Sequence, residues 1–187
     1  AMYKTTPAEF REAGKFYPLQ LEIRLQEEVV KKNDIQFATT SDIDDWMELV
    51  SLTIDGYPCL NETEYLENLR QCITEKRALI LRDDDMAIGI MAFSVGTGSI
   101  DFMAVHPQYR NLGITKAFLD KLMDELLEGK EISITTFRAG DKADTGYRDE
   151  LYRLGFVERE LLVEFGYPTQ RFVLPSKPKK ENGDLYD

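Results

Sequence analysis

The hydrophobic and polar positions change their period along the chain, most sharply between residues 99 and 127. Ser99–Val105 is a short, mostly apolar run of residues compatible with a strand. His106-Pro107 interrupts it, because proline cannot donate a hydrogen bond to a sheet. From Gly113 to Leu127, apolar residues recur every four positions and charged residues occupy the other side. The sequence therefore predicts a strand, a turn and a core-facing helix in immediate succession.

The same patterns divide the rest of the chain into further strands and helices. Strands are predicted at residues 35–39, 78–82, 86–95, 132–137, 157–165 and 170–174. Helices are predicted after Ser41, after Asn61 and over residues 145–154, because Ser and Asn are good N-caps and Gly155 is a typical helix end. The strands at 78–82, 86–95 and 99–105 should form an antiparallel meander. The strand at 132–137 should lie beside 99–105 and parallel to it, because a helix connects the two.

Three segments are predicted along the 187 residues. Residues 1–34 form a helical extension, with Thr6-Pro7-Ala8-Glu9 as a helix start and leucines at spacing four further on. Residues 35–175 form the main domain. Residues 176–187 are a polar tail. We expect the extension to pack on the domain, to line an acceptor site or to mediate a possible homodimer.

Composition narrows the classes of function. The net charge of −11 argues against a nucleic-acid partner, which requires a basic surface. It would attract cationic amines, although acidity also simply keeps a protein soluble. No apolar run approaches the roughly 20 residues that span a bilayer, and no secretory signal is visible, so we expect no membrane partner and a cytoplasmic location. One histidine and two cysteines predict no metal site and no Ser-His-Asp triad.

The turn before the central helix is the candidate site of chemistry. Residues 110–115 precede or open that helix, where backbone N–H groups have no partners within the helix and the dipole is positive. Such an end binds anions, usually phosphate, and Gly113 lets a ligand approach the backbone. A plain strand-to-helix turn explains the same pattern, and the spacing alone leaves both readings open.

The segment VHPQYRNLGITKAFLDKL resembles the acyl-CoA binding motif of the GNAT family of N-acetyltransferases, Gln/Arg-x-x-Gly-x-Gly/Ala after a strand ending in Val-x-Pro. Arg110 matches the first position of the motif and Gly113 the fourth. Thr115 stands where Gly or Ala is usual, which narrows the space beside a pyrophosphate but adds a hydroxyl donor. Leu154-Gly155-Phe156 is similar to the family's helix ending. With the element order of residues 35–175, the resemblance covers about three-quarters of the chain.

The resemblance implies a fold and a cosubstrate. The fold would be the α/β (α+β) acyl-CoA N-acyltransferase fold of the GNAT family, a mixed seven-stranded sheet with splayed central parallel strands flanked by helices. The cosubstrate would be acetyl-CoA, without a metal. The cofactor-binding positions that the resemblance implies are Met103, Ala104 and Val105 for the pantetheine arm, and Arg110, Asn111, Leu112, Gly113, Ile114 and Thr115 for the pyrophosphate.

The resemblance also implies N-acetyl transfer by direct attack of a primary amine, on a small molecule or a peptide, with no covalent enzyme intermediate. By the period of two, one strand face carries Ser99, Asp101, Met103 and Val105. Some family members carry a basic glutamate where Ser99 stands, so Asp101 on the same face is a candidate base. Tyr152 lies one residue from the family's usual tyrosine position, and Tyr147 about a turn earlier; both are candidate acids. Non-catalytic roles are equally open: Asp101 as a carboxylate paired with a neighbour, and the two tyrosines as ordinary core or surface residues.

Two other functions remain open at this point. The departure at Thr115 and the displaced tyrosine are compatible with a non-catalytic acyl-CoA-binding module. A generic nucleotide-phosphate binder is weaker, because the sequence contains no P-loop lysine pattern and no complete dinucleotide fingerprint.

Overall fold

The computed structural model describes residues 34–53 and 61–177. The helices predicted within residues 1–33, the turn at Gly56–Pro58 and most of the polar tail lie outside the described residues. The strands are β1 (Gln36–Phe37), β2 (Ala78–Asp83), β3 (Met86–Phe93), β4 (Ile100–Val105), β5 (Ile132–Phe137), β6 (Val157–Glu164) and β7 (Tyr167–Leu174). The helices are α2 (Ile43–Leu52), α3 (Glu62–Thr74), α4 (Ile114–Lys121) and α5 (Tyr147–Arg153), with short turns of other helix types at Thr40–Asp42, Pro107–Tyr109 and Leu122–Leu126.

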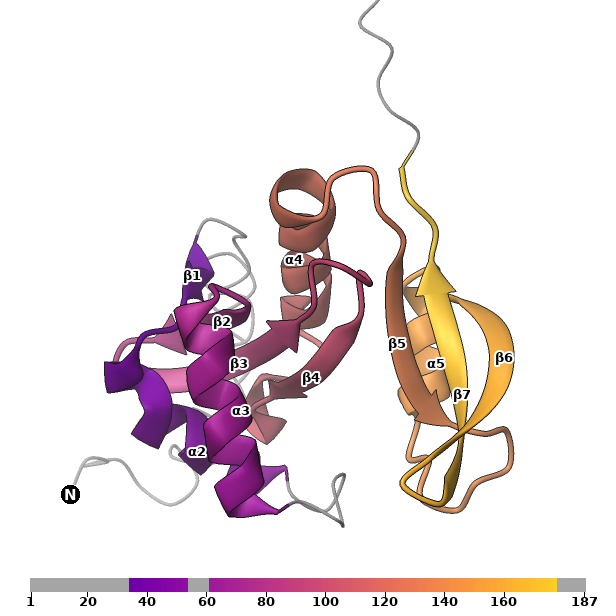
Figure 1. Ribbon diagram of the computed structural model, residues 1–187, viewed down its shortest axis with the longest axis horizontal. Helices are drawn as coiled ribbons and strands as arrows, with labels where there is room; N and C mark the ends of the chain where they lie inside the picture. Colours follow the sequence, from indigo (N-terminus) through magenta and orange to yellow (C-terminus); the bar gives the residue numbers. More distant parts are fainter. Residues whose placement is uncertain (1–33, 54–60, 178–187) are drawn as a thin grey trace, which may run out of the picture.

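The seven described strands have the predicted order and directions, but they form two hydrogen-bonded sheets rather than one. β1-β2-β3-β4 is antiparallel, and so is β5-β7-β6. Within the described residues, one isolated parallel bridge between Ser99 and Ser133 joins them, where the Ser133 N–H donates to the Gly98 carbonyl at 3.0 Å. Figure 1 shows β4 and β5 diverging from this junction. The splayed central strands are therefore present, and the divergence interrupts the sheet.

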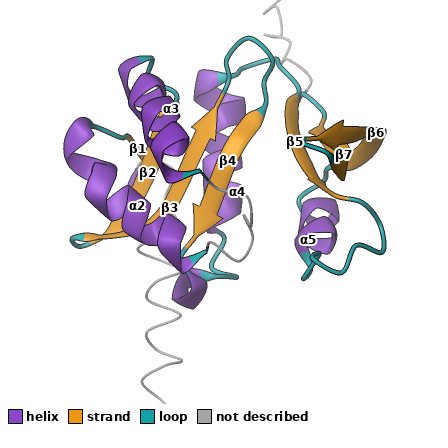
Figure 2. Cartoon of the chain, turned by 60° about the horizontal axis from the view of Figure 1, so that its bottom comes forward, coloured by secondary structure: helices purple, strands orange, loops and turns teal. Residues whose placement is uncertain are grey.

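Helices cover both faces of the first sheet (Figure 2). Trp46 and Leu49 of α2 and Leu69 of α3 are buried against one face. Phe118 and Leu122 are buried against the other, where α4 packs. Gly89 of β3 permits this close packing, because a Cβ there would lie 2.8 Å from a ring carbon of Phe118. The amphipathic pattern that predicts α4 thus reflects a real core contact.

The predicted caps are partly correct. Asn61 caps α3, accepting a hydrogen bond from the Glu64 N–H at 3.3 Å, as predicted. Ahead of α2 the cap is Thr39 rather than Ser41, because Thr39 and Asp42 form a reciprocal capping box. A single turn of tighter helix then precedes α2.

The second strand of the last hairpin, β7, begins earlier than predicted. Phe165 and Gly166 alone form its turn, with φ of 51° and 76°. Two left-handed residues match the twist of a two-residue hairpin, so β7 starts at Tyr167 and includes Pro168, which pairs with Val163. The turn predicted at residues 166–169 is therefore too long, because residues 167–169 belong to β7.

A β-bulge in β4 changes which residues share a face. The register with β3 shifts, so that Phe93 opposes Ile100 while Ala92 opposes Phe102. Asp101 is the extra residue between them. Ile100 consequently packs in the same cluster as Met103, and the predicted common face of Asp101 and Met103 is wrong.

Candidate active site

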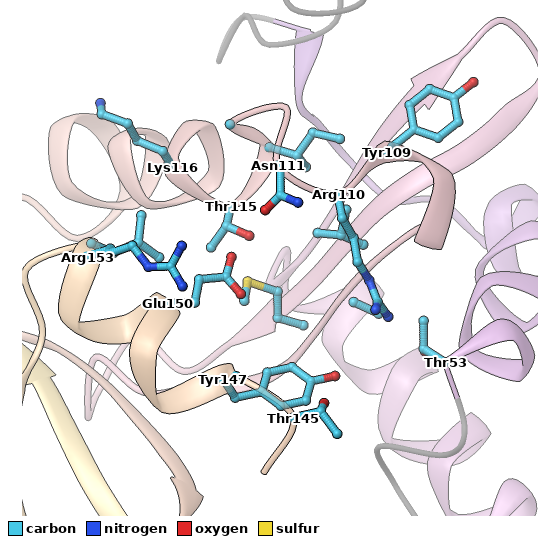
Figure 3. Close-up of a pocket in the computed structure, with 17 residues that line it drawn as sticks. Thr53, Tyr109, Arg110, Asn111, Thr115, Lys116, Thr145, Tyr147, Glu150 and Arg153 are labelled. Carbon is cyan, nitrogen blue, oxygen red and sulfur yellow. The ribbon is translucent and has the colours of Figure 1, made fainter. Parts of the chain in front are cut away.

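A cavity of about 450 Å³ lies where β4 ends and α4 begins, beside α5. Its walls are the last residues of β4, the loop and first turn of α4, one side of α5 along its whole length, and Thr53 just after α2 (Figure 3). The two sheets contribute opposite walls, because α5 belongs with β5, β6 and β7. The cavity is thus placed at the divergence of β4 and β5.

Eight of the nine predicted cofactor-binding residues line this cavity: Met103, Ala104, Val105, Arg110, Asn111, Gly113, Ile114 and Thr115. The ninth, Leu112, is only 7% exposed and is part of the core. Its side chain anchors the loop whose neighbours form the cavity wall. The structure therefore brings the predicted set together at one place.

The backbone of β4 presents hydrogen-bonding groups to the slot between the sheets. The His106 N–H donates to the Ile88 carbonyl of β3 at 2.8 Å. Because hydrogen-bonded pairs alternate along antiparallel strands, Ala104 also bonds toward β3, whereas the N–H and C=O of Val105 point to the opposite side. That side faces β5, with which the described residues of β4 form no strand ladder.

The N-terminus of α4 opens on the same cavity. Gly113 caps this helix in the left-handed conformation, with φ 79° and ψ 15°, and has no side chain to bond the first-turn N–H groups. Asn111 is also left-handed, with φ 63°. No other side chain of the described residues bonds the backbone N–H groups of residues 113–116. This end is therefore available to an anion.

Cationic side chains surround that end of the helix. Arg110 and Lys116 come from the α4 side, and Arg153 comes from α5 across the cavity (Figure 3). Lys116 is paired with Asp120 at 2.6 Å. No ion pair involving Arg110 or Arg153 occurs within the described residues. Arg110, Arg153 and the helix end favour a ligand with several phosphates, and Glu150 is the one acidic side chain among the described residues that line the cavity.

Of the three predicted catalytic residues, Tyr147 lines the cavity. Its ring lies 6.1 Å from that of Phe137, centroid to centroid. Asp101 does not line the cavity. Its carboxylate accepts hydrogen bonds from the hydroxyls of Ser94 at 2.6 Å and Ser99 at 2.9 Å, and lies 3.7 Å from Arg77.

Tyr152 also lies outside the cavity lining. Its hydroxyl donates to the Glu158 carboxylate and accepts from Arg148 at 3.3 Å. The bond to Glu158 raises the pKa of the Tyr152 hydroxyl above its ordinary value. Tyr152 is thus engaged in a separate polar cluster.

Sequence reasoning missed part of the cavity wall, including Thr53, Thr145, Glu150 and Arg153. Glu150 and Arg153 lie three and six positions after Tyr147, so the helical period of α5 could have indicated them. Thr53 carried no such signal, because only long-range packing brings the end of α2 to this place.

Within residues 34–53 and 61–177, no helix is long and apolar enough to cross a membrane. In the same residues, no three His, Cys, Asp or Glu side chains are grouped so that they could hold a metal ion. Cys72 is buried in the core, as its small apolar character predicts.

Comparison with known proteins places the fold. No curated protein matches the sequence. A GNAT-family acetyltransferase from Streptococcus agalactiae 2603 shares the fold, with TM-score 0.60 and 16% identity over 77% of this chain and 95% of that one. A GNAT-family acetyltransferase from Bacillus cereus ATCC 10987 gives 0.58 and 17% over 77% and 97%. The ribosomal-protein-S18-alanine N-acetyltransferase from Escherichia coli gives 0.57 and 21% over 82% and 98%.

The sequence itself matches a family model as well. The model for the acetyltransferase (GNAT) family matches residues 46–156, which is more than half of the chain and includes α4, its preceding loop and the Leu154-Gly155-Phe156 ending of α5. The chain therefore belongs to the GNAT family of acetyltransferases.

Proposed function

We propose that the protein is an N-acetyltransferase that transfers an acetyl group from acetyl-CoA to a primary amine of a small molecule or a peptide by direct attack. One observation carries the proposal: the N-terminus of α4, which has no side-chain cap, opens on a cavity lined by the end of β4 at its divergence from β5. Membership of the GNAT family, whose cosubstrate is acetyl-CoA, agrees with this arrangement.

The residues present fit acetyl-CoA. The N–H groups of residues 113–115 and the side chains of Arg110 and Arg153 would hold its phosphates, since they combine a helix dipole with two cations that have no carboxylate partner among the described residues. The C=O of Val105 would accept a hydrogen bond from an amide of the pantetheine arm. When bound, acetyl-CoA supplies an activated acetyl thioester.

The chain would supply a hydrogen-bond donor and an acid. The Val105 N–H points into the slot, so it is our candidate donor to the acyl oxygen as negative charge develops there. Tyr147 is our candidate proton donor to the departing thiolate, because its side chain lines the cavity while the hydroxyl of Tyr152 is bonded to Glu158.

A base is also required, because an amine with a pKa near roughly 10.4 is mostly protonated at neutral pH. Two carboxylates are candidates. Asp101 would act through water, since its carboxylate is held by Ser94 and Ser99 and does not line the cavity. Glu150 lines the cavity directly. The Asp101→Asn and Glu150→Gln variants distinguish them, because only loss of the true base lowers kcat and moves the acidic limb of its pH profile.

The direct test follows free thiol after mixing the protein with acetyl-CoA and a panel of primary amines. We expect amine-dependent thiol release above the amine-free background, and about 100-fold lower kcat in Tyr147→Phe, the usual scale for loss of a general acid. Tyr152→Phe is the comparison: its hydroxyl bonds Glu158 and Arg148 outside the cavity, so its kcat should fall by no more than about 10-fold. Absence of turnover with every amine would contradict the proposal.

The alternative is a non-catalytic acyl-CoA-binding module. Thr115 at a position where the family's motif has Gly or Ala, and the engagement of Tyr152 outside the cavity, both favour it. It predicts that CoA binds with a measurable heat while no amine is acetylated, so calorimetry beside the thiol assay separates the two functions.

A further inference from the structure

Arg148 of α5 is a charged residue buried against the sheet of β5, β6 and β7, outside the cavity. It is the second residue of α5 and is only 6% exposed. Its guanidinium carbon lies 5.0 Å from the centroid of the Phe172 ring. Burial of a cation is costly unless its donors are satisfied. The contacts of this guanidinium therefore need a structural explanation.

The guanidinium connects α5 to all three strands of its sheet. Nη1 donates to the Phe137 carbonyl of β5 at 2.8 Å and to the Gln170 Oε1 of β7 at 2.7 Å. Nη2 donates to the Glu158 carboxylate of β6. The Gln170 amide is itself oriented, because its Nε2 donates to the Arg159 carbonyl at 3.1 Å. The cluster of Arg148, Glu158 and Gln170 thus fixes the start of α5 on the sheet.

The same cluster reaches Tyr147 through Phe137. Arg148 holds the Phe137 carbonyl, and the Phe137 ring packs at 6.1 Å against that of Tyr147. α5 has seven residues, and Gly146 at its N-cap provides no side-chain cap. Because so short a helix has little stability of its own, its position depends on tertiary contacts.

We propose that the Arg148–Glu158–Gln170 cluster is the device that holds Tyr147 at the cavity, with Arg148 as a positioning residue rather than a catalytic one. The inference rests on the proposed function, in which Tyr147 is the proton donor. It also assigns a role to the Tyr152 hydroxyl, which completes the cluster by bonding both Glu158 and Arg148.

Glu158→Gln is the sharpest variant, because it removes the charge that compensates Arg148 while preserving shape at an exposed position. Glu160→Gln is the matched control: it lies on the same strand, and its carboxylate is 3.5 Å from the more exposed Arg171. Steady-state kinetics are measured for both variants, each also in the Tyr147→Phe background. Arg148→Lys tests whether charge alone suffices without the planar fork.

We expect Glu158→Gln to lower kcat about 10-fold, since misplacement of a catalytic group by about 1 Å can cost up to about 100-fold. The KM for acetyl-CoA should rise by less than kcat falls, because only Arg153 of the proposed phosphate-binding groups lies on α5, whereas Arg110 and the helix N–H groups belong to the α4 side. Glu160→Gln should be unchanged. In the Tyr147→Phe background, Glu158→Gln should have no further effect, since the cluster acts through Tyr147.

An unchanged kcat in Glu158→Gln, or a full additional loss in the Tyr147→Phe background, would overturn the inference. A wild-type protein without turnover would instead overturn the proposed function. The fluorine NMR resonance of a fluorotyrosine at position 147 keeps the two apart, because it needs no turnover. It should move in Glu158→Gln but not in Glu160→Gln, and an unmoved resonance in Glu158→Gln also refutes the inference.

Discussion

Gly98 stands beside the only strand pairing between the two sheets within the described residues, and its replacement tests how that junction is built. Its carbonyl accepts the Ser133 N–H at 3.0 Å, beside the single bridge from Ser99 to Ser133. Its φ is +68°, a left-handed value that residues other than glycine adopt at a cost. A Cβ at Gly98 would lie 2.2 Å from the Glu131 carbonyl oxygen.

The size of the effect follows from these values. Ordinary contacts begin near 3.4 Å, so the two backbones must separate by about 1 Å to admit a methyl group. The left-handed conformation adds about 1–2 kcal/mol for alanine. Loss of the Ser133 hydrogen bond adds about 1 kcal/mol. We therefore expect Gly98→Ala to lower the free energy of unfolding by about 2–3 kcal/mol, before any residual clash.

The same turn contains a control. A Cβ at Gly96 would have no other atom within 4 Å, and Gly96 does not have a left-handed φ, so Gly96→Ala should change the free energy of unfolding by less than about 0.5 kcal/mol. Urea unfolding followed by the fluorescence of Trp46, the single and fully buried tryptophan, measures both variants. Equal stability of the two variants would refute this account of the junction.

Three further predictions concern other parts of the molecule. Burial lowers the pKa of His106, the sole histidine, below its ordinary value of about 6.5. The unfolded chain therefore binds the proton more readily, and the free energy of unfolding should fall as the pH falls below about 6.5. A proton NMR titration of His106 with a midpoint above about 6.5 would contradict this. Burial raises the pKa of Asp42, but hydrogen bonds from the Thr39 N–H and Arg82 outweigh it and leave the pKa lowered. Asp42→Asn should therefore lower the free energy of unfolding by about 1–2 kcal/mol at pH 7. The difference between wild type and variant should vanish as the pH falls below about 4, where the native Asp42 carboxylate takes up a proton. Urea unfolding at pH 7 and at low pH measures this difference. Phe165 is fully exposed with φ +51°, so Phe165→Asn should raise the free energy of unfolding by about 0.5–1 kcal/mol, and a lower melting temperature would count against it.

The sequence predicts the α4 region well, because there local pattern and tertiary structure agree. The change of period at Gly113 marks the helix start, and the apolar residues that follow are those buried against the first sheet. Apart from Arg153 of α5, the groups that we propose to hold phosphate lie within this one continuous segment. Sequence reasoning could therefore name its residues without knowing the pairing of the strands.

The catalytic candidates depended on information that no local pattern contains. The bulge at Asp101 arises from the pairing of β4 with β3, so the period of two failed at that residue. Tyr147 and Tyr152 both lie on a helix of seven residues, and the rotation of that helix is set by Arg148 and its partners on three separate strands. Only the assembled sheet shows which tyrosine reaches the cavity.

Calorimetric titration of coenzyme A into the wild-type protein and the Gly113→Val variant tests the central claim most directly. Valine cannot adopt the left-handed conformation of Gly113 without strain, and its side chain would crowd the first-turn N–H groups of α4. We predict one bound coenzyme A per wild-type chain and no measurable binding to the variant, with circular dichroism showing that the variant remains folded. No heat with the wild type at millimolar coenzyme A, or equal affinity in a folded variant, would contradict the account.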